Sequence, residues 1–223
     1  MAAGKTNAGQ RKNIPVWLVY SIGLAPAVWQ FCRGATGNLG ADPVKAFELF
    51  LGLWAIRFLI LTLAVSPARQ LFGLNFMRYR RALGLLCFYY ASMHLAAYLV
   101  LDQALMLSAI LEDVLKRPFI MLGMAAFVLL LPLALTSNAF SIRRLGRNWV
   151  RLHRLVYAIA ICAGVHLALA TKVLSADQYV YLGLIALLLG YRLFRPGLKP
   201  RRKRASNAAP QAFRPRVSPS NTQ

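Results

Sequence analysis

The chain has 223 residues, of which 58% are hydrophobic and 15% charged, and its formal net charge is +21. The hydrophobic residues occur in six blocks of about 17–22 residues, the length that crosses a bilayer core of ~30 Å, which excludes an ordinary soluble domain. The positive charge does not indicate nucleic-acid binding. The lysines and arginines lie mostly between and beyond the hydrophobic blocks, where they set membrane orientation and contact anionic lipid.

The six blocks predict an all-α polytopic membrane protein, a bundle of six transmembrane helices that forms one domain over residues 14–195. In chain order the predicted helices are 14–32, 47–65, 83–101, 119–135, 150–171 and 178–195. Residues 1–13 form a short N-terminal segment, and residues 196–223 are predicted to be a disordered basic tail. The segment 103–115 is too short and too acidic to span the membrane. Its pattern suits either a short helix on the outer surface or a plain loop.

The distribution of charge predicts the orientation of the bundle. Most of the lysines and arginines lie in the N-terminal segment, the second and fourth connections and the tail, which share one side. The positive-inside rule therefore places both termini in the cytoplasm. All six acidic residues lie on or next to the opposite side: Asp42, Glu48, Asp102, Glu112, Asp113 and Asp177.

The three histidines are the main candidates for chemistry, because an ionisable side chain inside a membrane span is costly. His94 and His166 lie roughly 18 and 24 Å from the inner surface at about 1.5 Å per residue, so both fall in the outer half of the membrane. Two imidazoles that face each other there would suit a bis-histidine b-type haem, and packing is the competing interpretation for each. Zinc is less suitable, because no convergent Cys, Asp or Glu accompanies them and none of the three cysteines lies in a C-x-x-C motif.

His153 lies roughly 20 Å closer to the inner surface, and about 140° around an ideal helix from His166. A second bis-histidine haem would need a ligand near residues 80 and 81, but those positions are Arg80 and Arg81. Three roles therefore stay open for His153: a single axial ligand, a proton-handling residue at a quinone or flavin site, or a structural residue.

Arginines crowd the predicted inner side, and orientation together with lipid phosphates accounts for most of them. Arg80, Arg81 and Arg151 are candidates for contact with a haem propionate or a flavin phosphate, since arginine binds such groups bidentately. Arg57 lies near the centre of the second helix, where a charge needs a partner. The partner of Arg57 could be a haem propionate, a polar cavity or the backbone carbonyls of a neighbouring helix.

Four motifs resemble the ferric-reductase-like transmembrane family. The sequence RYRRALGL at 78–85, followed by His94, is similar to the third helix of that family, and LGRNWVRLHRLVY at 145–157, followed by His166, to its fifth. LGADPV at 39–44 and RPF at 117–119 narrow the resemblance to the MsrQ group, the haem-binding membrane subunits of bacterial methionine-sulfoxide reductase systems. The similarity extends over about residues 15 to 195.

The resemblance implies an electron-transfer subunit of the bacterial inner membrane, whose catalytic partner is a separate protein. It implies haem b, with His94 and His166 as axial ligands to the iron and His153 as the third family histidine, and it also implies FMN. Electrons would come from membrane quinones or a cytosolic flavin reductase. They would reach a periplasmic molybdopterin reductase, MsrP, that repairs methionine sulfoxide in oxidised envelope proteins.

The second helix-3 histidine of the related NADPH oxidases and ferric reductases is missing, and so is a cytosolic FAD/NADPH domain. Both absences argue against a two-haem mechanism fed by NADPH, while a second haem at His153 stays among the open roles of that residue. Electrons would enter near His153 and leave at the outer face, where acidic loops containing Asp42 and Asp102 would bind the partner. Two alternatives remain open: a stand-alone transmembrane cytochrome that reduces iron or quinones, and a non-redox, transporter-like bundle.

Overall fold

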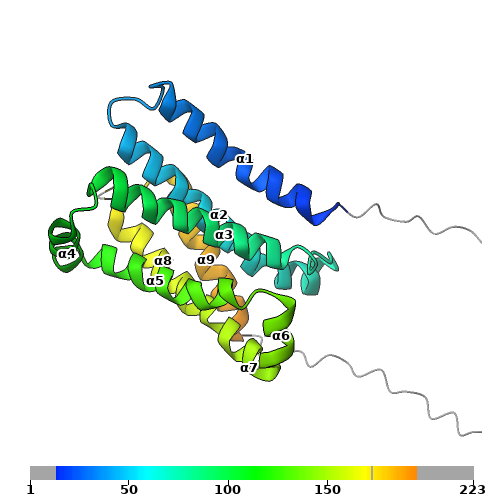
Figure 1. Cartoon of the computed structure of the whole chain (residues 1–223). Helices are drawn as coiled ribbons and strands as arrows, with labels where there is room; N and C mark the ends of the chain where they lie inside the picture. Colours follow the sequence, from blue (N-terminus) through cyan, green and yellow to red (C-terminus); the bar gives the residue numbers. More distant parts are fainter. Residues whose placement is uncertain (1–13, 172, 195–223) are drawn as a thin grey trace, which may run out of the picture.

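The computed structural model describes residues 14–171 and 173–194, and within them the chain is helical without strands (Figure 1). The predicted N-terminal segment and basic tail lie outside the described residues. A helix is present at each of the six predicted positions: α1 (Val16–Ala35), α2 (Pro43–Phe72), α3 (Arg80–Ala97), α5 (Pro118–Leu135), α8 (Val156–Ala170) and α9 (Ala176–Phe194).

Among the described residues, four helical stretches are long and apolar enough to cross a membrane, judged by length and composition. They are Pro43–Phe72, Arg80–Asp102, Pro118–Leu135 and Arg147–Ala170. The all-α, transmembrane fold class is thus confirmed. For α1 and α9 the structure confirms a helix, but neither belongs to this group of four.

α2 is longer than predicted at both ends. It begins at Pro43, because the Asp42 side chain accepts a hydrogen bond from the Lys45 backbone N–H (3.0 Å) and proline suits the first helical position. It ends at Gly73, whose φ of 67° is the left-handed conformation typical of a helix C-terminus. The hydrophobic block marks only the apolar middle of this helix, so the prediction of 47–65 was too short.

The predicted helix 150–171 corresponds to the helical stretch Arg147–Ala170, but this stretch is not one regular α-helix. It consists of α7 (Arg147–Leu152), a 3₁₀ turn (His153–Leu155) and α8. The sequence analysis also missed α6 (Ala139–Leu145). The Asn138 side chain caps α6 by accepting a hydrogen bond from the Ser141 N–H (2.7 Å), and Gly146 ends it with a φ of 49°. The angle expected between His153 and His166 on one ideal helix therefore does not apply.

The segment after α3 forms a cap across one end of the bundle. The chain continues from α3 as a π-helical turn (Tyr98–Asp102), and α4 (Leu107–Lys116) follows. Of the two interpretations left open for 103–115, the structure thus shows the short helix. α4 lies at the opposite end of the bundle from α6 and α7, whereas α1 begins and α9 ends at the α6–α7 end (Figure 1).

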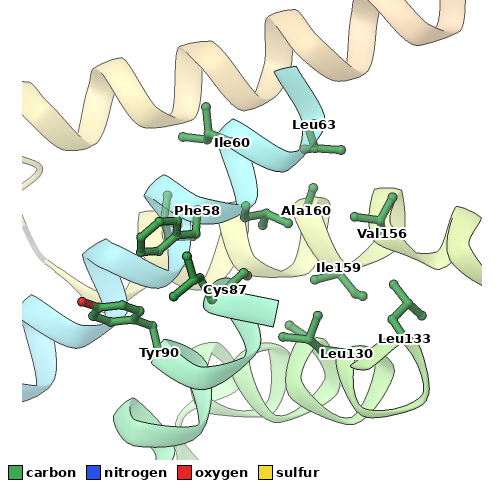
Figure 2. Close-up of a cluster of buried hydrophobic side chains, with 14 of the residues drawn as sticks. Phe58, Ile60, Leu63, Cys87, Tyr90, Leu130, Leu133, Val156, Ile159 and Ala160 are labelled. Atoms are coloured by element: carbon green, nitrogen blue, oxygen red, sulfur yellow. The ribbon is translucent and has the colours of Figure 1, made fainter. Parts of the chain in front are cut away.

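Two helix pairs make up the centre of the bundle. α2 packs most extensively against α3, and α5 against α8. Side chains from all four helices meet in one buried cluster (Figure 2). It includes Phe58, Leu63, Cys87, Tyr90, Leu130, Leu133, Val156, Ile159 and Ala160.

α1 is attached to this centre by a side chain that bonds to its backbone. The Tyr90 hydroxyl donates to the Gly23 carbonyl (2.8 Å) and accepts from the Ala27 N–H (3.1 Å), an acceptor and a donor one helical turn apart in α1. Gly23 permits the close approach, because a Cβ there would lie 2.5 Å from Cδ1 of the buried Leu86.

Candidate cofactor site

A cavity of about 310 Å³ lies between the two central helix pairs. It is open because small residues face it from all four helices, among them Gly52, Ala91, Gly123 and Ala163. Larger apolar residues complete its walls: Leu49, Leu53, Ile56, Leu59, Leu95, Phe119, Ile120, Met124, Phe127, Leu130, Ile159 and Leu167. A cavity with these walls suits a hydrophobic ligand with a few polar contacts.

The structure brings His94 and His166 together in this cavity. His94 comes from α3 and His166 from α8, so each helix pair contributes one imidazole. The ring centres lie 6.2 Å apart and the ring planes are inclined by 72°.

Both imidazoles are held in the same way, by a backbone carbonyl of the partner helix. His94 Nδ1 donates to the Glu48 carbonyl of α2 (2.9 Å), and His166 Nδ1 donates to the Phe119 carbonyl of α5 (2.7 Å). A carbonyl oxygen can only accept, so each Nδ1 carries the proton and each Nε2 keeps its lone pair. This is the usual support of a metal-ligating histidine.

A glycine follows each of these carbonyl residues by four positions, which is one helical turn. A Cβ at Gly52 would lie 3.3 Å from Cε1 and Nδ1 of His94, and a Cβ at Gly123 would lie 2.9 Å from the same atoms of His166. The two helix pairs therefore form matching half-sites, each with a histidine, a carbonyl acceptor and a glycine.

The separation of the rings fits one metal atom between them. An imidazole nitrogen lies about 1.1 Å from the ring centre and binds a metal at about 2.0–2.1 Å, so rings on opposite sides of one metal have centres about 6.3 Å apart. The observed 6.2 Å agrees with that value.

The cavity is polar at one end only. Lys45, Glu48, Asp102 and Arg117 line it where α2 and α5 begin and the π-helical turn ends, at the α4 end of the bundle. The deeper lining is apolar and includes Leu59, Cys87, Leu130 and Ile159. The shape suits an amphiphilic group whose polar edge faces the α4 end.

The other predicted site residues lie away from this cavity. Arg80 and Arg81 begin α3 and Arg151 belongs to α7, at the opposite end of the bundle, and none of them lines the cavity. His153 lies at the same end as these arginines. Its ring stacks on Trp149 with ring centres 3.9 Å apart, its Nδ1 donates to the Trp149 carbonyl (3.1 Å), and its Nε2 is buried without a partner among the described residues.

Arg57 finds its partners outside the cavity. Its Nε donates to the Tyr181 hydroxyl of α9 (2.8 Å), and its guanidinium lies over the Trp54 ring, 4.9 Å from the centre. The partner of this charge is thus a hydroxyl and an aromatic face, and no hydrogen bond to a backbone carbonyl is formed within the described residues.

Sequence reasoning missed Gly52, Gly123, Lys45 and Arg117. The signal that could have found them is the two motifs at 39–44 and 117–119. The first ends one residue before Lys45, and the second contains Arg117 and the acceptor Phe119. Each motif lies at the start of a helix whose backbone carbonyl accepts a hydrogen bond from one histidine. Gly52 follows the first motif by eight residues, and Gly123 follows the second by four.

Comparison with known proteins identifies the family of the chain. Residues 51–164 match the family described as ferric reductase like transmembrane component. A relative from Brucella anthropi is 53% identical over 205 residues, covering 90% of this chain and 93% of the relative. Relatives from Rhizobium meliloti and Brucella ovis are each 57% identical, over 81% and 84% of this chain and 83% and 85% of their own lengths.

All three relatives carry the name protein-methionine-sulfoxide reductase heme-binding subunit MsrQ. The family match includes His94 and His153 and ends two residues before His166. No solved structure matches the chain.

Proposed function

The chain belongs to the ferric-reductase-like transmembrane family and, within it, to the MsrQ group, and on that premise we propose that it binds haem b between His94 and His166 and carries electrons across the bacterial inner membrane. The observation that carries the proposal is the pair of imidazoles, 6.2 Å apart, each with its Nδ1 bound to a carbonyl. Two rings held in this tautomer offer two Nε2 lone pairs to one iron.

Haem b held by His94 and His166 would supply a one-electron carrier with no position left open for a substrate, which favours electron transfer over substrate binding. The residues of the chain do the rest. The carbonyls of Glu48 and Phe119 fix the ring orientations, and Gly52 and Gly123 give the rings room. The apolar walls provide a hydrophobic surround for the deeper part of the site.

The proposed direction of transfer is outward. Membrane quinols, or a cytosolic flavin reductase, would supply electrons at the α6–α7 end, which is crowded with arginines and would face the cytoplasm with both termini. The acceptor would be a separate periplasmic MsrP-like molybdopterin reductase. Its reaction consumes two electrons and two protons per methionine sulfoxide and yields methionine and water. Oxidation of one quinol to quinone would supply the two electrons and release two protons where the quinol is bound, whereas the two protons consumed would come from the periplasm.

His153 stays a candidate for the inner site, as an axial ligand or as a proton-handling residue beside a quinone or flavin. Its buried Nε2 without a partner supports a ligand there, and Arg80 is near enough to interact with it electrostatically. FMN is proposed from the resemblance alone. Acid extraction of the purified protein followed by flavin fluorescence tests it.

Reconstitution tests the function. The chain in lipid nanodiscs with a quinol analogue and an MsrP-like partner should reduce methionine sulfoxide, and His94→Ala or His166→Ala should abolish the reaction. Turnover by either variant at the wild-type rate would overturn the proposal. Reduction of ferric citrate without any partner would favour the stand-alone cytochrome instead.

The outer carboxylates test the partner surface. Asp42→Asn and Asp102→Asn should slow electron transfer to the MsrP-like partner, because surface charges steer such encounters. The rate should also depend less on salt concentration than it does in the wild type. Asparagine caps a helix as well as aspartate does, so Asp42→Asn keeps the start of α2. Arg143→Gln, at the opposite end of the bundle, is the control. Unchanged coupling in the two Asp variants would remove these residues from the interface.

A further inference from the structure

The polar end of the cavity contains two cationic side chains on opposite walls. Apart from the histidines, Lys45 and Arg117 are the only basic residues among those that line the cavity in the described part of the chain. Lys45 belongs to the first turn of α2, and Arg117 directly precedes α5.

Each cation belongs to one of the two half-sites. Lys45 lies three residues before Glu48, whose carbonyl holds His94, and Arg117 lies two residues before Phe119, whose carbonyl holds His166. Each half-site therefore has a cation at the cavity mouth, one turn or less from the carbonyl that orients its histidine. This matched placement would serve a ligand that is bound between the histidines and carries two anionic groups on one edge.

Both cations have hydrogen-bonding capacity to spare. Lys45 Nζ lies 3.9 Å from Glu48 Oε2, too far for a strong hydrogen bond, and its side chain is 65% exposed. Arg117 uses Nε for its ion pair with Asp113 Oδ1 (2.9 Å), and its two terminal nitrogens have no partner among the described residues. Glu48 and Asp102 line the same end, so an anionic group placed there depends on these two cations.

We propose that Lys45 and Arg117 bind the two propionates of haem b, one each, and so fix its polar edge toward the α4 end. The inference rests on the proposed function and deepens it. A carboxylate at the deeper end would meet Leu59, Leu130 and Ile159, where burial without a partner is costly. The assignment replaces Arg80, Arg81 and Arg151, which do not line the cavity.

The test compares haem b with its dimethyl ester, in which both carboxylates are blocked. Wild-type protein, Lys45→Gln, Arg117→Gln and the double variant are reconstituted with each, and the rate of loss to apomyoglobin is measured. Each single variant should lose haem b on the order of tenfold faster, since a charge-assisted hydrogen bond is removed, while loss of the ester stays as in wild type. The double variant should lose haem b and its dimethyl ester at the same rate.

A redox titration gives a second readout. Each variant should have a lower midpoint potential, because an uncompensated propionate favours the ferric state. Asp102→Asn should shift the potential in the opposite direction. The control is Lys116→Gln. Lys116 is next to Arg117 but pairs with Glu112 and does not line the cavity, so this variant should keep the wild-type midpoint potential.

The outcomes separate this inference from the function on which it rests. Wild-type protein that binds no haem refutes the function, whereas wild-type protein that holds haem b and the ester equally well refutes only the two propionate contacts. Reconstitution with the ester also shows whether a variant is folded. If a Gln variant fails to assemble, Lys45→Arg and Arg117→Lys, which keep the positive charge, take its place. The two contacts are refuted if the wild-type protein loses haem b and its dimethyl ester at the same rate.

Discussion

Gly123 lies directly against the ring of His166, so closely that a Cβ on Gly123 would be 2.9 Å from Cε1 and Nδ1 of the imidazole. Gly123→Ala should therefore displace the ring, weaken its bond to the Phe119 carbonyl and lower the haem content of the purified protein. Gly52→Ala should have a smaller effect, because its Cβ would lie 3.3 Å from His94. The pyridine haemochrome assay measures the haem-to-protein ratio.

Gly190 of α9 provides the matched control, since nothing lies within 4 Å of the position of its Cβ. Gly190→Ala should keep the wild-type haem content. Equal haem content in Gly123→Ala and Gly190→Ala would show that the close approach does not matter for the site.

The Tyr90 hydroxyl bridges two backbone groups of α1. Tyr90→Phe should lower the free energy of unfolding by about 1–3 kcal/mol, because the Gly23 carbonyl and the Ala27 N–H lose a buried partner. Thermal unfolding in detergent measures the loss, and hydrogen exchange should locate it in α1. Tyr89→Phe alters the adjacent, exposed tyrosine and should change neither. Identical stability and exchange in the two variants would contradict the bridging role.

Arg57 lies in the middle of α2, and within the described residues its one hydrogen-bond partner is the Tyr181 hydroxyl of α9. Tyr181→Phe keeps the ring under the guanidinium and removes that acceptor. The expected loss of stability is ~1.5–3 kcal/mol, the range for a hydrogen bond to a charged group. Tyr179→Phe, an exposed tyrosine on the same helix, serves for comparison. No difference between the two would mean that Arg57 is satisfied without Tyr181.

The sequence predicted the positions of the helices and the meeting of His94 with His166, because both depend on local hydrophobicity and on depth along each helix. Depth was enough for the two histidines because α3 and α8 both end at the same face of the bundle. The 3₁₀ turn at His153 was not predictable in this way, since no glycine or proline interrupts residues 147–163 to mark it.

The details of the site depend on which helices become neighbours. Gly52 and Gly123 face the imidazoles only because α2 pairs with α3 and α5 with α8, and a sequence does not state that pairing. For the same reason the sequence analysis assigned possible propionate contacts to Arg80, Arg81 and Arg151 and did not consider Lys45 or Arg117. The arginine cluster on the predicted inner side was conspicuous in the sequence, whereas two single cations at helix starts were not.

The most direct test of the account is a reduced-minus-oxidised visible spectrum of the purified protein, recorded beside His94→Ala and His166→Ala. Circular dichroism and size-exclusion chromatography of each variant establish that the bundle is intact. We expect the wild type to show the α band of a bis-histidine b-type haem, and both folded variants to lose the band of the haem between these residues. A wild-type protein that stays colourless after expression with added haem, or a folded variant that keeps the full band, would contradict the account.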